Sequence, residues 1–152
     1  MKILMVCLGN ICRSPLAHGV MEHLVKENNL DWEIDSAGTG GWHIGQQPDK
    51  RSIAVAQKYG VDISQQSVRQ ICIDDFDLFD RILVMDYNNL NDVKEIARTE
   101  SDANKISLFL KDEIVPDPYY DDNQFDPVYR MIEKRCKEII GELKSDMKSS
   151  AI

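Results

Sequence analysis

The sequence predicts an α/β fold in a single domain, with a four-stranded, parallel, twisted sheet and helices on both of its faces. Two observations support this fold class. Short apolar or alternating segments suited to strands recur along the chain, and segments with apolar residues at helical spacing lie between them. Strands that alternate with helices are typical of parallel, doubly wound sheets. The expected strands lie at residues 3–6, 32–36, 82–85 and 106–109, and the expected helices lie within residues 16–25, 48–60, 90–97 and 128–143.

The first strand leads directly into a short loop and a helix. Residues 3–6 form a short, apolar, partly β-branched run, as in a strand that is buried on both faces. After the loop, Pro15 can occupy the first helical position, where no backbone N–H is needed, and Ser14 can cap the helix. An apolar stripe through residues 16–25 gives this helix a buried face. The loop is therefore expected at the carboxyl edge of the sheet, where open α/β folds bind ligands.

The rest of the chain continues this alternation. A second helix is expected to begin near Pro48 and to end at Gly60, because glycine commonly terminates helices. The last helix covers about 128–143, and the residues from about 145 are expected to fray. The sequence contains no repeat, linker or low-complexity segment, and 152 residues that are 43% hydrophobic suit one core. We therefore expect one domain over residues 1–152.

The composition disfavours several classes of function. A net charge of −8 argues against nucleic acids and anionic membrane surfaces as partners. No segment approaches the ~20 apolar residues of a membrane span, and the first residues form a strand rather than a signal peptide. The four cysteines show neither metal-ligand pairs nor the density of a disulfide scaffold, and the three histidines complete no metal site. We expect a cytoplasmic monomer.

The loop after the first strand concentrates reactive side chains in the string Cys7-Leu8-Gly9-Asn10-Ile11-Cys12-Arg13-Ser14. Its amides and the positive end of the following helix dipole would face an anion such as phosphate. The same field favours the thiolate of Cys7, and the planar guanidinium of Arg13 matches two phosphate oxygens at once. Gly9 allows tight backbone curvature, and Asn10 tolerates left-handed geometry. The pattern predicts a nucleophile in a phosphate cradle. The alternative is a structural, buried Cys7 with a surface Arg13.

This loop and a later Asp117-Pro118-Tyr119-Tyr120 segment resemble the low-molecular-weight protein tyrosine phosphatases. The resemblance covers nearly the whole chain. It implies hydrolysis of phosphotyrosine in proteins, and of small aryl phosphates, through a phosphocysteine at Cys7 and without a metal or other cofactor. Arg13 and the amides of residues 8–13 would hold the phosphate. Further matching segments are Asp35-Ser36-Ala37, Trp42 with Gly45, Val68-Arg69-Gln70, Asp75-Phe76, Val84-Met85-Asp86 and Asn89-Leu90.

A long polar segment at residues 111–127 is the second candidate functional element. It carries five Asp, three Pro and two Tyr, and a segment of this length without periodicity is usually a functional lid or a disordered tail. The adjacent tyrosines favour packing over disorder. Hydrolysis of an aryl phosphate needs a proton for the departing phenolate, and Asp117 between two prolines is a rigidly presented carboxyl group. The resemblance assigns Asp117 that role; a solvated acidic loop is the alternative.

The resemblance also implies supporting roles. Ser14 resembles the residue that donates a hydrogen bond to the thiolate and later helps it leave, and Asn10 resembles the residue that holds the loop through Ser36. Where the family often has a histidine, this chain has Gln66, whose amide can both donate and accept. The remaining expected site residues are Leu8 and Trp42 at the mouth of the cleft, Tyr119 as an aromatic wall, and Leu8, Gly9, Ile11 and Cys12 in the cradle.

Cys12 is expected to make the activity redox-sensitive. It shares the loop with Cys7, at a separation that a curled backbone can bring within disulfide reach. In the family that the chain resembles, the equivalent cysteine captures the oxidised nucleophile.

Two alternative functions use the same loop. An arsenate reductase on this fold would need further redox cysteines, typically a closely spaced later pair, and the isolated Cys72 and Cys136 do not provide one. A non-catalytic phosphate-binding module would keep the cradle but has no use for Cys7 together with Asp117.

Overall fold

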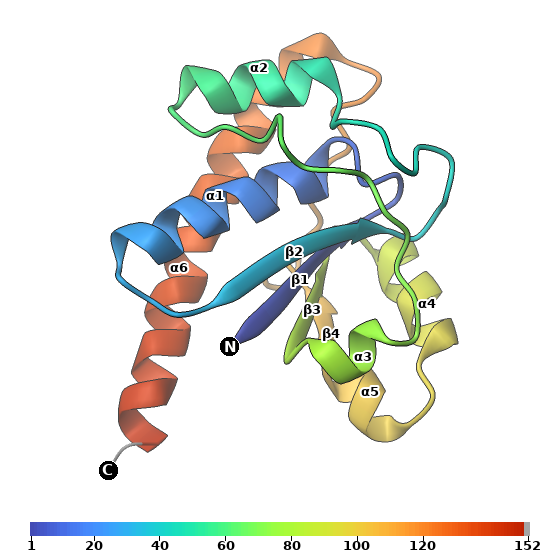
Figure 1. Ribbon diagram of the computed structural model, residues 1–152, viewed down its shortest axis with the longest axis vertical. Coiled ribbons are helices and arrows are strands. Elements are labelled where there is room, and N and C mark those ends of the chain that lie inside the picture. The colour runs from blue at the N-terminus through green and yellow to red at the C-terminus, as the bar shows by residue number, and fades with distance from the viewer. Residues whose placement is uncertain (151–152) are drawn as a thin grey trace.

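The computed structural model describes the backbone of residues 1–150 and the side chains of residues 1–147. In this part of the chain, four parallel strands form one sheet in the order β2-β1-β3-β4. This confirms the predicted fold class. The central strand β1 lies between β2 and β3 (Figure 1). Its Met5 lies opposite Ser36 of β2 and Leu83 of β3. The strands are β1 (Lys2–Cys7), β2 (Glu33–Gly38), β3 (Arg81–Val84) and β4 (Ile106–Leu108).

Helices cover both faces of the sheet, as the alternation of segments predicted (Figure 1). One layer contains α1, α2 and α6, which contact one another, and the other contains α3, α4 and α5, with α4 and α5 packed along β4. The helices are α1 (Arg13–Glu27), α2 (Lys50–Lys58), α3 (Asp75–Leu78), α4 (Tyr87–Ile96), α5 (Glu100–Asn104) and α6 (Phe125–Ser150), with a 3-10 turn η1 (Asp122–Gln124) before α6.

The alternation of side chains along β1 divides the core between these two layers. Ile3 and Met5 are buried in the cluster that contains α1 and α6, whereas Leu4 and Val6 are buried in the cluster that contains α3 and α4. All four side chains have no exposed surface. A strand buried on both faces needs such a continuous apolar run, which is why this segment was recognisable in the sequence.

The ends of the last helix differ from the prediction. It begins at Phe125, before the expected start, and it continues through Ser150, past the positions from about 145 that were expected to fray. The prediction for residues 151–152 lies outside the described residues. The short helices α3 and α5 were not predicted, because four or five residues are too few to show helical periodicity.

The topology brings several loops to one edge of the sheet. The loop after β1, the residues that follow Gly38 at the end of β2 and the residues that follow Val84 at the end of β3 all leave the sheet at its carboxyl edge. Among the described residues, no helix is both long and apolar enough to cross a membrane.

Candidate active site

The phosphate loop, residues 7–13, joins β1 to α1 at the carboxyl edge of the sheet (Figure 1). Asn10 has a φ of 58°, the left-handed geometry that was expected of it. A Cβ at Gly9 would meet its nearest protein atoms at 3.5 Å, an ordinary contact, so packing within the protein does not require glycine at this position. The close approach occurs at Gly38 instead, where a Cβ would lie 2.8 Å from the carbonyl oxygen of Leu8 and 3.0 Å from the amide of Asn10. The loop therefore packs directly onto the end of β2.

Helix α1 begins inside the phosphate loop, earlier than predicted. Cys12 is its N-cap and Arg13 its first residue, so the prediction that Ser14 caps the helix is wrong. Pro15 is the third helical residue rather than the first, but it still lies in the turn whose N–H groups have no partner within the helix. No described side chain caps α1, which leaves these first N–H groups available to an anion.

The Ser14 hydroxyl contacts the Cys7 sulfur. Sγ and Oγ are 3.0 Å apart, and the Asn10 amide nitrogen donates to the same hydroxyl oxygen at 2.8 Å. Asn10 is oriented by its other side-chain atom, since Oδ1 accepts from the backbone N–H of Arg69 at 3.1 Å. The hydroxyl oxygen therefore accepts from Asn10, and its own proton is free to point at Cys7, because the alternative acceptor, the Ala37 carbonyl, is 3.5 Å away.

Arg13 is buried and held in place from two directions. Its Nη1 donates to Oδ2 of Asp86 at 2.7 Å and to the carbonyl oxygen of Val115 at 3.0 Å, and its Nη2 lies 3.8 Å from Oδ2 of Asp117. Burial alone would lower the pKa of Arg13, but the Cys7 sulfur, the hydrogen bond to Asp86 and the Asp117 carboxylate together raise it. The guanidinium is therefore a fixed, permanent positive charge beside the nucleophile.

Asp86 is a functional residue that the sequence reasoning did not assign to the site. It follows β3 directly, its Oδ2 orients Arg13, and its Oδ1 accepts from the backbone N–H of Asn89 as the N-cap of α4. One signal could have identified it, namely a carboxylate immediately after a buried strand, at the edge of the sheet where ligands bind.

Asp117 lies at the mouth of the site, on the segment that leads from β4 to α6. Its side chain is 37% exposed, and its Oδ1 accepts from the backbone N–H of Tyr119 at 3.1 Å. A carboxyl group at this position can reach both the solvent and a group bound over the phosphate loop. The rings of Tyr119 and Tyr120 contact each other edge to face, but the two residues are 41% and 90% exposed, so the packing that the sequence predicted for both is not seen for Tyr120.

The phosphate loop and the Asp117 segment enclose a cleft of about 220 Å³. Cys7 lies at its base, 3% exposed, whereas Trp42 at its rim is 68% exposed. Of the predicted residues, Asn10, Ser14 and Ser36 do not line the cleft. Two further residues, His43 and Tyr120, line it without having been predicted. The predicted residues that line it are Cys7, Leu8, Gly9, Ile11, Cys12, Arg13, Trp42, Asp117 and Tyr119.

Cys12 lines the cleft together with Cys7, and both are buried free thiols. Burial raises the pKa of Cys12 to about 12, and the negative charges of Asp49 and Cys7 add to the effect. Cys12 therefore stays protonated at neutral pH and does not compete with Cys7 as a nucleophile.

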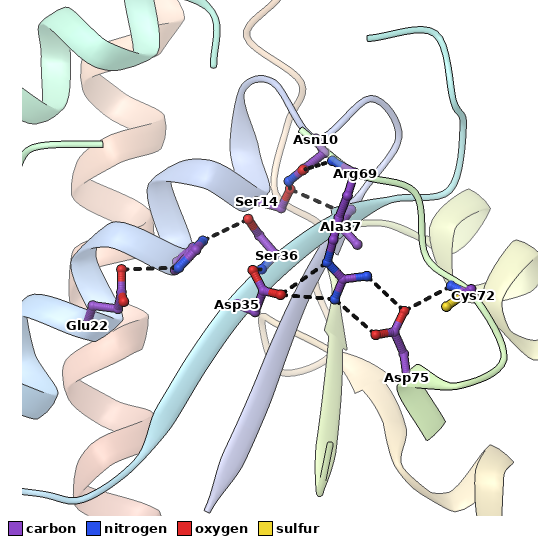
Figure 2. A network of polar contacts seen from close by, with 10 residues as sticks. Asn10, Ser14, Glu22, Asp35, Ser36, Ala37, Arg69, Cys72 and Asp75 are labelled. Atoms are coloured by element: carbon purple, nitrogen blue, oxygen red, sulfur yellow. Dashed lines mark hydrogen bonds and ion pairs between the residues drawn. The ribbon is translucent and has the colours of Figure 1, made fainter. Parts of the chain in front are cut away.

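Ser36 takes part in a different network from the expected one. Its hydroxyl contacts Nδ1 of His18 at 2.8 Å. The Asn10 side chain instead contacts the Ser14 hydroxyl and the backbone N–H of Arg69. Nε2 of His18 lies 3.1 Å from Glu22, so in the neutral ring Nε2 donates to the carboxylate and Nδ1 accepts from Ser36. Figure 2 shows this chain of contacts running from α1 to β2 beside the Asn10 and Ser14 pair. The predicted path from Asn10 through Ser36 is therefore wrong.

Gln66 occupies the position where the family often has a histidine. Its Nε2 donates to the carbonyl oxygen of Pro15 at 3.0 Å, so it supports the first turn of α1 rather than Ser36. The neighbouring Arg69 is fixed by ion pairs with Asp35 and Asp75, and this holds the backbone N–H that orients Asn10 (Figure 2).

The described residues contain no cluster of three or more His, Cys, Asp or Glu side chains that could hold a metal ion. His18 and His23 each pair with a glutamate one helical turn further along α1.

Comparisons with known proteins agree on one family. The family model described as low molecular weight phosphotyrosine protein phosphatase matches residues 2–149. Low molecular weight phosphotyrosine protein phosphatase 1 of Drosophila melanogaster is 40% identical over 149 residues, which cover 93% of this chain and 96% of the relative.

Solved structures of relatives are similar over almost the whole chain. A protein tyrosine phosphatase from Entamoeba histolytica superposes with a TM-score of 0.90 at 35% identity, covering 97% of this chain and 99% of the other. A Drosophila protein described as an arginine phosphatase superposes with a TM-score of 0.89 at 37% identity, covering 96% of this chain and 99% of the other.

Proposed function

Because this chain belongs to the low molecular weight phosphotyrosine protein phosphatase family, we propose that it hydrolyses phosphotyrosine in proteins through a phosphocysteine on Cys7. The observation that carries the proposal is the convergence of three groups on one cleft. The Cys7 sulfur lies at the base beside the Ser14 hydroxyl, the Arg13 guanidinium is fixed next to it, and the Asp117 carboxyl group stands at the mouth.

In the first step the Cys7 thiolate attacks phosphorus. A sulfur–phosphorus bond forms and the bond between phosphorus and the tyrosine oxygen breaks. Arg13 and the amides of the phosphate loop hold the equatorial oxygens as charge develops on them. Protonated Asp117 gives its proton to the departing phenolate, which leaves as a neutral phenol.

In the second step Asp117, now a carboxylate, takes a proton from a water molecule. The water oxygen bonds to phosphorus, the sulfur–phosphorus bond breaks, and inorganic phosphate leaves. The proton of Ser14 points at the returning thiolate, since the hydroxyl oxygen already accepts from Asn10. This hydrogen bond stabilises the sulfur as a leaving group.

The shape of the cleft supports an aryl phosphate as substrate. Cys7 is buried at the base, while Trp42 and Tyr119 provide aromatic surface at the rim. A phosphotyrosine side chain is long enough to place its phosphate at the base and its ring between these side chains, whereas phosphoserine is shorter and has no ring. The attraction for phosphate is local, since the chain carries a net charge of −8.

We also propose that the enzyme works as a monomer in a reducing compartment such as the cytoplasm, without a cofactor. All the residues of the proposed mechanism come from one chain. The described cysteines are free, and a reducing compartment keeps them so.

Phosphoarginine is a second candidate substrate, because one of the structurally similar proteins is described as an arginine phosphatase. Arsenate reduction is disfavoured by the position of the other thiols. Cys72 is exposed and Cys136 is buried against α1, and neither lines the cleft.

The test is phosphate release with a metal chelator present, comparing a phosphotyrosine peptide with the same peptide carrying phosphoarginine. We expect steady turnover of phosphotyrosine by the wild type and none by Cys7→Ser, which should still bind phosphate or vanadate because its cradle is unchanged. Faster release from phosphoarginine would refute the tyrosine assignment. Substantial hydrolysis by Cys7→Ser would refute the covalent mechanism, and turnover of arsenate with thioredoxin alone would favour the reductase.

A further inference from the structure

Arg51, near the start of α2, connects the phosphate loop to the segment that carries Asp117. It does not line the cleft, and Figure 1 shows α2 beside the start of α6, where this segment ends. The Arg51 Nη1 donates to the carbonyl oxygen of Tyr119 at 2.9 Å and to Oδ1 of Asp122 at 2.7 Å. Its guanidinium carbon lies 5.3 Å from the ring centroid of Tyr119 and 4.6 Å from that of Phe125.

The Arg51 side chain is connected to the phosphate loop through Asp49. Two guanidinium nitrogens of Arg51 donate to the two Asp49 oxygens at 3.0 and 2.9 Å. The backbone N–H of Asp49 donates in turn to the carbonyl oxygen of Ile11 at 2.8 Å, and its Oδ1 caps α2 by accepting from the backbone N–H of Arg51. The hydroxyl of Ser52 adds a contact to the carbonyl oxygen of Cys12. Arg51 therefore projects from a rigid extension of the phosphate loop.

The other end of Arg51 holds the residue that orients Asp117. Tyr119 accepts from Arg51 through its carbonyl oxygen, and it donates to Oδ1 of Asp117 through its backbone N–H. The same guanidinium also lies over the Tyr119 ring, so this residue is held at both its backbone and its side chain. A displacement of Tyr119 would move the Asp117 carboxyl group with it.

We propose that Arg51 is a positioning residue that sets the distance between the general acid and the leaving oxygen, an inference that rests on the proposed function. A general acid must lie within about 2.6–3.2 Å of the oxygen that it protonates. Misplacement by about 1 Å can reduce a rate about 10²-fold. Among the described residues, the Asp117 side chain has one ion pair, with Arg13, and one hydrogen bond, from the Tyr119 backbone, so a residue that holds Tyr119 also bears on the position of Asp117.

The chain offers a matched control arginine away from the cleft. Arg98 pairs with Asp102 on its own segment and with the distant Asp77, just as Arg51 pairs with Asp49 and a distant carboxylate. The Arg51 and Arg98 side chains are similarly exposed, at 34% and 38%. Removing either guanidinium therefore removes a comparable surface network, but only Arg51 touches the Asp117 segment.

The experiment measures kcat/KM on two aryl phosphates, phenyl phosphate and 4-nitrophenyl phosphate. Phenolate needs a proton to leave, whereas 4-nitrophenolate leaves readily without one. We expect Arg51→Met to reduce kcat/KM about tenfold or more on phenyl phosphate and much less on 4-nitrophenyl phosphate. Arg98→Met should change both by no more than about twofold. The inhibition constant of phosphate should be unchanged in both variants, because the phosphate loop is intact.

A double mutant separates positioning from general destabilisation. In an Asp117→Asn background there is no acid left to position, so Arg51→Met should add almost no further loss on phenyl phosphate. Equal losses of the single Arg51 variant on both substrates, or a full additional loss in the Asp117→Asn background, would overturn the proposal.

A milder substitution serves as a control for misfolding. If Arg51→Met fails to fold, Asp122→Asn keeps Arg51 and alters only an exposed carboxylate, and it should show a smaller loss that is again confined to phenyl phosphate. An equal effect on both substrates in that variant would also overturn the proposal. Loss of both activities to the same extent in Asp117→Asn itself would instead refute the acid role of Asp117, and with it this inference, while turnover that still depends on Cys7 would leave the rest of the proposed function in place.

Discussion

Replacing Asp117 by asparagine removes the transferable proton and leaves most of the surrounding contacts in place. Asparagine has nearly the same shape, and its Oδ1 can still accept from the backbone N–H of Tyr119, which lies 3.1 Å from the carboxylate of Asp117 in the wild type. What disappears is the acid itself and the negative charge that lies 3.8 Å from Nη2 of Arg13. The variant therefore isolates proton transfer from the structure of the loop.

The effect of losing the acid and the effect of losing the ion pair with Arg13 differ enough in size to be separated. The ion pair with Arg13 involves a carboxylate that is 37% exposed, and such pairs contribute about 0–1 kcal/mol, or at most about fivefold in rate. General acid catalysis contributes about 10²- to 10⁴-fold, equivalent to about 2.7–5.4 kcal/mol. The charge change should also leave phosphate binding unchanged or tighter, since a carboxylate near the phosphate repels it.

The assay compares kcat/KM for phenyl phosphate and 4-nitrophenyl phosphate, because this constant includes the step in which the phenol leaves. We expect Asp117→Asn to lose about 10²- to 10⁴-fold on phenyl phosphate and far less on 4-nitrophenyl phosphate. An equal loss on both substrates, or a loss below about tenfold on phenyl phosphate, would show that Asp117 serves structure only. Asp121 and Asp122 would then be the next carboxylates to replace.

Three further substitutions test the rest of the site. Arg13→Lys should lose both phosphate affinity and kcat, because the ammonium group of lysine cannot replace the planar guanidinium that Asp86 already fixes. An unchanged inhibition constant for phosphate would contradict this prediction. Mild peroxide should oxidise Cys7 to a sulfenic acid, which Cys12 converts to a disulfide with loss of water, and added thiols should then restore the phosphatase activity. Peptide mapping checks the Cys7–Cys12 bond, and the activity of Cys12→Ser should recover poorly after the same treatment. Because burial raises the pKa of Cys12, the disulfide should form faster as pH rises above neutrality. Gly38→Ala should lower stability by about 1–3 kcal/mol and reduce turnover, because its Cβ would lie 2.8 Å from the Leu8 carbonyl oxygen; an unchanged melting temperature would refute the close approach.

The sequence was informative wherever the relevant interactions are local. A buried strand, a loop and a helix start follow one another within residues 3–16, so the phosphate loop is recognisable without knowledge of the rest of the fold. The left-handed conformation of Asn10 is likewise a property of one residue. The alternation of strands and helices predicted the parallel sheet, and the parallel sheet predicted the edge at which the loop would lie.

The residues that sequence reasoning missed act across long separations along the chain. Asp86 orients Arg13 from the end of a different strand, and Gly38 allows the loop to pack against β2. Arg51 contacts a carbonyl oxygen on the segment before α6. Asp86 carries one signal in the sequence, its place directly after a buried strand. The roles of Gly38 and Arg51 depend instead on which backbone or side chain the fold brings opposite to them.

The support behind α1 shows the same dependence on packing. Gly19 lies inside this helix, where glycine costs about 1 kcal/mol relative to alanine. A Cβ at Gly19 would lie 2.3 Å from Cγ2 of Ile63 and 3.5 Å from Nε2 of Gln66. The glycine therefore lets the segment after α2 approach α1 closely enough for Gln66 to reach the carbonyl oxygen of Pro15.

Gln66 contacts Pro15, so a different residue makes the contact with Ser36. His18 supplies it from the next turn of the same helix, so α1 is held to β2 through His18 and to the segment after α2 through Gln66. The first turn of α1 carries Arg13, and Gln66 contacts this turn at Pro15. Ser36 therefore contacts a histidine that α1 supplies, although the sequence position at which the family often has a histidine holds Gln66 and contacts Pro15 instead.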